Sequence, residues 1–105
     1  MPHYLLAYHG GSGIPESVEK QEQFRAEWER WFTDLGEANV DPGYPVGATR
    51  TVSGDGTVTD GGGANPVGGY SIIKADSMDA AVKLARGCPV LAIGGTVEVG
   101  ETLPM

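Results

Sequence analysis

The sequence predicts an α+β fold in which two helices cover one face of an antiparallel sheet. Residues 4–8 and 70–75 are short runs rich in aromatic, β-branched and other apolar side chains, which is typical of strands. Residues 15–35 carry apolar side chains at helical spacing, and residues 77–86 repeat that pattern over a shorter length. Two helical patterns among several short strands favour this class over an all-α or all-β fold.

The first strand is apolar on both of its faces. Tyr4, Leu6 and Tyr8 alternate with Leu5 and Ala7. A strand with one face in water should alternate between apolar and polar residues. We therefore expect both faces to be covered, one by the helices and the other by a second subunit, which makes the predicted assembly a homodimer.

The first helix is expected to begin near Pro15, whose missing N–H costs nothing at a first helical position. Its apolar stripe has the spacing i, i+4, i+7 and i+11 and consists of Phe24, Trp28, Trp31 and Leu35, with Phe32 beside it. Gly36 is the natural C-terminal cap.

A hairpin is predicted between the two helices. Residues 39–47 contain two prolines and two glycines, so we expect a loop or the irregular start of an edge strand. Residues 48–52 and 57–59 are predicted strands that flank a turn at residues 53–56. A glycine-rich loop at residues 60–66 follows them.

The second helix has clear signals at both ends. Asp76 or Ser77 can cap its first turn, Gly87 can take the left-handed conformation after its last turn, and Pro89 cannot continue it. Residues 92–93 and 96–99 are predicted to supply the last strand.

The predicted order β-α-β-β-β-α-β is a ferredoxin-like arrangement with both helices on one face of the sheet. Two such sheets packed through their open faces would make a dimeric α/β barrel. We find neither a repeat nor a linker in residues 1–105, and we treat the chain as a single domain.

Net charge, cysteine content and hydropathy argue against several classes of partner and location. A formal net charge of −7 argues against partners such as nucleic-acid phosphates or anionic membranes, which require a basic surface. A single cysteine cannot form an internal disulfide framework. The sequence shows neither an apolar run long enough for a bilayer nor a basic-then-apolar leader, so a cytoplasmic location is expected.

Several segments, in order along the chain, resemble the YCII-related family and in particular its DGPF-type branch. They are residues 4–8, 31–36, 57–61, 68–70, 76–81, 88–89 and 97–99. The resemblance implies a ferredoxin-like dimeric α/β barrel. It also implies that most relatives have no established activity, that some are suspected of acid–base chemistry through a His–Asp pair, and that a dehydrochlorinase of aromatic degradation belongs to the same superfamily.

The chain departs from the family pattern at three places. The Asp-Gly-Pro-Phe motif reads Asp60-Gly61-Gly62-Gly63 here, and the Glu-Val-Arg-Pro ending reads Glu98-Val99-Gly100-Glu101. Arg25 stands near the position of the histidine proposed as catalytic in simpler members. These departures favour binding without catalysis.

His9 and Asp60 are the candidate catalytic residues. A histidine beside a carboxylate can transfer protons near neutral pH. The alternatives are a partly exposed histidine at a strand end and an aspartate that caps a turn. His3 is interpreted as a terminal surface residue.

Trp28, Arg50 and Tyr70 are the candidate binding residues. Trp28 could line an aromatic pocket or lie in the core, and Arg50 could pair with a substrate carboxylate or with a surface acid. The loop Gly10–Gly13 could offer backbone N–H groups to an anion, although loop flexibility explains it better. Cys88 fits a buried inert thiol.

We expect no metal and no cofactor, because two histidines and one cysteine show no ligand spacing.

Two functions from different classes remain. The first is a small-molecule-binding barrel without catalysis of its own. The second is a lyase- or isomerase-type enzyme that uses His9 and Asp60 as a proton-transfer pair. An interaction module whose purpose is pairing is a third, weaker reading.

Overall fold

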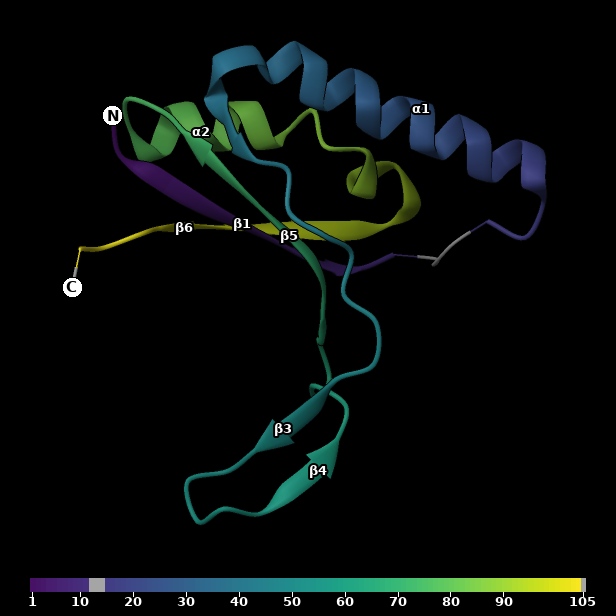
Figure 1. Cartoon of the computed structure of the whole chain (residues 1–105), viewed down its shortest axis with the longest axis vertical. Helices are drawn as coiled ribbons and strands as arrows, with labels where there is room; N and C mark the ends of the chain where they lie inside the picture. The colour runs from purple at the N-terminus through teal and green to yellow at the C-terminus, as the bar shows by residue number, and fades with distance from the viewer. Residues whose placement is uncertain (12–14, 105) are drawn as a thin grey trace.

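A four-stranded antiparallel sheet with two helices on one face forms the body of the protein (Figure 1). The structure, a computed structural model, describes residues 1–11 and 15–104. Its elements are β1 (His3–Gly10), α1 (Val18–Leu35), the 3-10 turn η1 (Gly36–Ala38), β2 (Asn39–Asp41), β3 (Arg50–Val52), β4 (Val58–Asp60), β5 (Val67–Lys74), α2 (Met78–Ala85), the 3-10 turn η2 (Pro89–Ile93) and β6 (Gly95–Glu101). The sheet order β2-β5-β1-β6 is consistent with the predicted ferredoxin-like arrangement.

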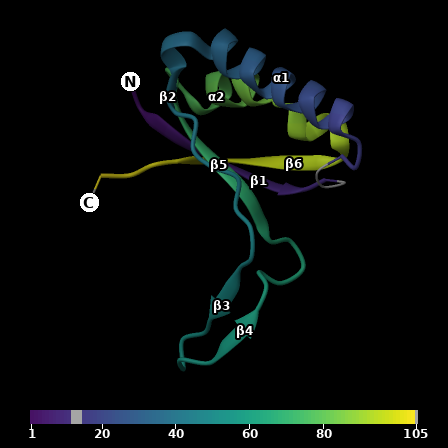
Figure 2. The same ribbon diagram turned by 45° about the vertical axis from the view of Figure 1, so that its right-hand side comes forward.

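The central strand β1 separates the two faces of the sheet. Tyr4, Leu6 and Tyr8 are buried beneath the helices. Leu5 and Ala7 project to the other face because successive side chains in a strand alternate, and Leu5 is exposed there. The helices thus cover one face of β1, as predicted, while the other face is open in a single copy of the chain (Figures 1 and 2).

Helix α1 begins later than predicted and ends where predicted. Ser17 caps it, with its Oγ accepting a hydrogen bond from the Lys20 backbone N–H at 3.1 Å. The expectation of a start near Pro15 was therefore wrong by three residues, because the hydroxyl cap outweighs the proline preference. At the other end Gly36 has φ 56° and its N–H donates to the Thr33 carbonyl, which confirms the predicted cap.

Helix α2 is capped by Ser77, but Gly87 does not take the left-handed conformation that the sequence predicted. The chain instead continues in tight turns, with the Gly87 N–H donating to the Leu84 carbonyl at 3.2 Å. A Cβ at position 87 would lie 3.1 Å from the Trp31 Nε1 atom. Glycine therefore provides room for the indole of α1, which donates to the Leu84 carbonyl at 3.3 Å.

The strand predicted at residues 92–93 was also wrong. Residues 89–93 form the 3-10 turn η2, which opens with Pro89 and closes at Gly94 with φ 83°. A proline at the first position of a helical turn and a left-handed glycine after it favour a turn over an extended strand.

The β3–β4 hairpin stands apart from the body. Its turn is confirmed by a 2.8 Å hydrogen bond from the Ser53 N–H to the Thr57 carbonyl and by the Asp55 carboxylate, which accepts from the Thr57 N–H at 2.9 Å. Every residue from 50 to 60 is exposed. Figures 1 and 2 place the hairpin on the side of the sheet opposite the helices.

Residues 42–46 are held against β5 by a buried chain of hydrogen bonds. The Tyr8 hydroxyl donates to the Ser71 Oγ at 2.7 Å, and the Ser71 hydroxyl in turn donates to the Pro42 carbonyl at 2.6 Å. Burial raises the pKa of Tyr8, so the phenol stays protonated and able to donate. Gly43, with φ 71°, allows the close approach, since a Cβ there would overlap the Tyr70 carbonyl.

We expect Ser71→Ala to lower the free energy of unfolding by about 1–3 kcal/mol, because it leaves the Tyr8 hydroxyl and the Pro42 carbonyl without partners. Tyr8→Phe should cost less, about 0.5–1.5 kcal/mol, because Ser71 keeps its own acceptor. Urea unfolding of the two single variants and the double variant measures the difference. Equal losses of unfolding free energy in the two single variants would contradict hydrogen bonds that run from Tyr8 to Ser71 and from Ser71 to Pro42.

Candidate functional site

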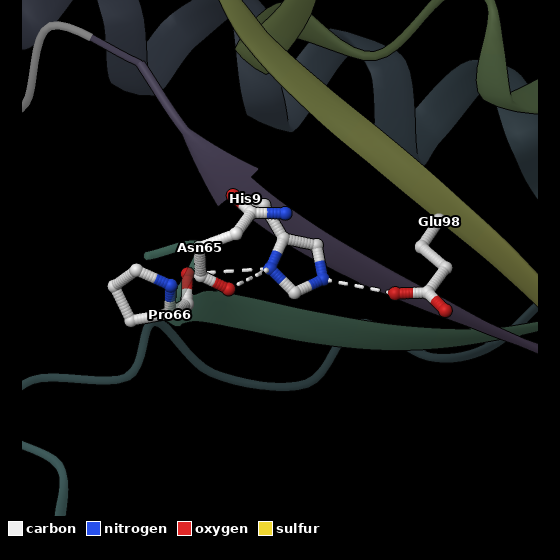
Figure 3. A network of polar contacts seen from close by, with 4 residues as sticks. All are labelled: His9, Asn65, Pro66 and Glu98. Carbon is white, nitrogen blue, oxygen red and sulfur yellow. Dashed lines mark hydrogen bonds and ion pairs between the residues drawn. The ribbon is translucent and has the colours of Figure 1, made fainter. Parts of the chain in front are cut away.

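His9 lies near the end of β1 and is held on both sides of its ring (Figure 3). Its Nδ1 atom is 3.1 Å from the Asn65 carbonyl oxygen and 3.2 Å from the Pro66 carbonyl oxygen. Its Nε2 atom is 3.1 Å from the Glu98 Oε1 atom on β6. The His9 side chain is only 12% exposed, whereas that of Glu98 is 75% exposed.

The partners of the ring determine where its protons can lie. Carbonyl oxygens only accept hydrogen bonds, so Nδ1 must carry a proton to bind Asn65 and Pro66. An ionised Glu98 carboxylate also only accepts, so the cationic ring satisfies both sides at once. Such an oriented histidine–carboxylate pair can bind a polar group or hold a proton for transfer.

Position in the sheet explains why His9 meets Glu98. Strand β6 runs antiparallel to β1, with Ala7 opposite Glu98 and His9 opposite Thr96. The odd-numbered residues of β1 and the even-numbered residues of β6 therefore share the open face. His9 and Glu98 are diagonal neighbours on that face.

Reasoning from the sequence did not single out Glu98. A usable signal was present, since Glu98 stands between two valines in a predicted strand and so faces away from the core. The ferredoxin-like order also predicts that the last strand lies beside the first. Together they would have placed a carboxylate on the face of His9.

Asp60 and Arg50 come together on the hairpin. They are opposite each other in the β3–β4 register, and the Arg50 Nε atom is 3.6 Å from the Asp60 Oδ1 atom. The Asp60 side chain is 96% exposed. In a single copy, the carboxylate in contact with His9 is thus Glu98, and Asp60 pairs with Arg50 instead.

Trp28 lies in an aromatic cluster between α1 and the face of the sheet that the helices cover. Its ring is 5.0 Å from Tyr8 and 5.7 Å from Trp31, centre to centre, in edge-to-face geometry. Tyr70 is opposite Ala7 in the β1–β5 register and so shares the open face with it. The structure therefore separates these two candidate binding residues onto opposite faces of the sheet.

Two open hollows lie on the helix side of the molecule. One, of about 480 Å³, is bordered by the end of α2 and by η2, and the other, of about 700 Å³, lies between the two helices and the start of the chain. Trp31 borders both of them. None of the five candidate site residues borders either hollow, so both are separate from His9.

The structure also places Cys88 and the start of the Gly10–Gly13 loop. Cys88 is buried, and burial raises the pKa of its thiol to about 11, which disfavours the reactive thiolate. Gly10 is the last residue of β1, Gly11 follows it, and the rest of the Gly10–Gly13 loop lies outside the described residues. Within residues 1–11 and 15–104, no cluster of three or more His, Cys, Asp or Glu could hold a metal ion. Nor does any helix in this part of the chain have the length and apolar character to cross a membrane.

An antiparallel sheet in ferredoxin-like order, with helices on one face and a histidine–carboxylate pair on the other, defines a small α+β domain. The family model for the YCII-related domain matches residues 1–105, so the chain belongs to the YCII-related domain family. No curated protein matches it.

We expect neutral His9 to carry its proton on Nδ1, because two carbonyl oxygens face that atom, whereas the Glu98 side chain is 75% exposed and can turn from Nε2 into water. The ¹⁵N chemical shifts of the ring, measured by NMR in alkaline buffer, report the tautomer directly. His3, an exposed residue, is the internal control and should show the Nε2-protonated form that is common in free histidine. A proton on Nε2 of neutral His9 would contradict the arrangement.

Proposed function

We propose that this protein is a homodimeric small-molecule-binding domain, in which two sheets pack through their open faces and enclose the ligand site as an α/β barrel. The observation that carries the proposal is the His9–Glu98 pair beside the apolar centre of the open face. Binding sites typically combine apolar walls with a few placed polar groups.

The centre of the open face has the composition of an interface core. Leu5, Ala7, Tyr70 and Ile72 share it through the β1–β5 register, and no helix covers it. Fully buried interface cores are depleted in charge and enriched in aromatic and apolar residues. A second copy, related by twofold symmetry, presents the same surface and so can cover its partner.

The His9–Glu98 pair stands at one end of this apolar surface. A ligand with an apolar body can lie over Leu5, Ala7 and Ile72 while its polar group reaches the ring or the carboxylate. Closure by a second sheet would exclude water and strengthen those polar contacts.

A lyase- or isomerase-type enzyme is the second candidate. The fixed orientation of the His9 ring favours it, because a proton-transfer group must be positioned before its pKa matters. Here His9 is the proton-transfer group, and its carboxylate partner is Asp60 or, within one copy, Glu98. Exchange of a ligand proton with deuterated solvent that is lost in His9→Gln would support this candidate over simple binding.

We expect the protein to be a dimer in sedimentation equilibrium at micromolar concentration, and Ala7→Glu to raise the dimer dissociation constant at least about 100-fold. The new carboxylate would stand beside Glu98 on the face that the second copy covers, and burying an unpaired charge in an interface is costly. Ala26→Glu, the same change at an exposed position on α1, is the matched control and should remain dimeric. A concentration of about 100 μM is high enough to populate even a weak dimer. A wild-type protein that is still monomeric there would rule out the barrel.

We expect Glu98→Gln to weaken binding of the best hit from a library of aromatic acids, phenols and amines by roughly 10-fold or more, since it removes a charge-assisted contact to His9. Protein-observed NMR titration measures the affinity, and shifts should concentrate at His9, Tyr70 and β6. Glu101→Gln is the matched control, because it makes the same change three residues along the same strand, on the other face. Equal weakening by both variants would contradict a site at His9.

A further inference from the structure

The β3–β4 hairpin lies in solvent in a single copy of the chain. Every residue from 50 to 60 is exposed, including Val52, which is 69% exposed, and Val58, which is 53% exposed. Two-stranded hairpins are at best marginally stable in water without a surface to pack against. The radius of gyration, 14.9 Å, exceeds the roughly 13 Å expected for a compact domain of this length.

One face of the hairpin combines apolar and charged groups. Val52 is opposite Val58, and Arg50 is opposite Asp60. All four side chains share a face because they are two residues apart along each strand. An exposed pair such as Arg50–Asp60, at 3.6 Å, contributes little to stability by itself.

The hairpin and the open sheet face form the two arms of an L. Figures 1 and 2 show the hairpin extending from the sheet on the side away from the helices, which is the side of the open face. Two extents of the molecule are 43 and 42 Å, and the third is only 18 Å. A second copy seated on the open face would therefore lie within the corner of the L.

The areas support this arrangement. Strand spacing and rise give the open sheet face a projected area on the order of 500 Å². A stable interface buries about 800 Å² per partner, so the sheet alone falls short. One face of the hairpin adds on the order of 200 Å² and brings the total close to what a dimer needs.

The charges are complementary as well. Of the seven Lys and Arg residues, five lie on the two helices or cap them: Lys20, Arg25, Arg30, Lys83 and Arg86. The hairpin carries Arg50 beside Asp60. The open face carries Glu98 beside His9 at one end and Lys74 opposite His3 at the other. Arg50 is a cation that matches the Glu98 carboxylate, and the Asp60 carboxylate can accept a hydrogen bond from a ring N–H of His9.

We propose that the hairpin is an exchanged arm, which packs on a second copy of this chain so that Arg50 meets Glu98 of the partner subunit and Asp60 meets the partner's His9. This inference rests on the proposed dimer and names the segment that completes it. It makes each ligand site composite, with the histidine from one copy and the Arg50–Asp60 pair from the other. The His9–Asp60 pair suggested by the sequence then forms between subunits.

The base of the hairpin allows a clean excision. The Gly61 N–H donates to the Thr49 carbonyl at 2.8 Å across the base of the hairpin. With only two residues between Thr49 and Gly61, the same bond becomes the closing hydrogen bond of a β-turn. Residues 50–60 can therefore be replaced by Asn-Gly, a preferred two-residue turn, without disturbing the sheet. Near-UV circular dichroism of the tryptophans checks that the core is intact.

We expect the excised variant to stay folded and to raise the dimer dissociation constant, measured by sedimentation equilibrium, at least 10-fold relative to the full chain. If the full chain is dimeric and the excised variant matches its dissociation constant within a factor of two, the exchanged arm is refuted while the open-face dimer stands. If the full chain is itself monomeric while folded, the proposed dimer fails and the arm fails with it.

Two further variants decide the outcome should the excised chain fail to fold. Val52→Thr with Val58→Thr keeps the shape and strand preference of the hairpin but removes its apolar contact, and should weaken the dimer. Arg50→Glu with Asp60→Arg keeps the pair within the hairpin but reverses its alignment with the partner subunit, and should also weaken the dimer. An unchanged dissociation constant in both would overturn the inference.

Discussion

The burial of Tyr4, Leu6 and Tyr8 beneath the helices is the constraint on which the rest of the structure depends. Strand β1 pairs with β5 on one side and with β6 on the other, so it cannot rotate. Once one set of its side chains is buried, the period of two sends Leu5, Ala7 and His9 to the opposite face. The contact between His9 and Glu98 is therefore a consequence of how the core packs.

The same constraint separates the aromatic residues from the polar site. Trp28 packs edge-to-face against Tyr8 and Trp31 and so stabilises the helix side of the sheet. The open side keeps only Tyr70 among the candidate aromatic contacts. A ligand on the open face would thus meet a histidine, a carboxylate, one tyrosine and aliphatic walls, which suits a small molecule with a single polar end.

The glycine-rich region after β4 links the two surfaces of the L. Asp60 ends the hairpin, and the Asn65 and Pro66 carbonyls a few residues later hold the His9 ring. One connection therefore both orients the histidine and carries the hairpin away from the sheet. This coupling gives the segment Asp60–Gly63 a structural role in the placement of both the site and the hairpin.

Local signals in the sequence determined most of the secondary structure. The hydroxyl of Ser77, the glycine after Leu35 and the turn at residues 53–56 act through neighbouring backbone groups, so their effects can be read without the fold. The two-faced pattern of the first strand likewise predicted one face covered by helices. The predictions for Pro15, Gly87 and residues 92–93 were wrong because a competing cap, the Trp31 indole and a proline-led turn determined the backbone there.

The tertiary structure decided the partners of the candidate residues. Glu98 is 89 positions from His9 along the chain, and only the antiparallel pairing of β6 with β1 brings them together. The sequence predicted the hairpin itself but not its position away from the sheet. That position depends on the paths of residues 42–46, which run beside β5, and of residues 60–66, which lead into β5. The sequence by itself determined the elements and the family pattern, since these depend on short-range spacing. Which side chains share a face and meet depends on strand register, which only the folded sheet defines.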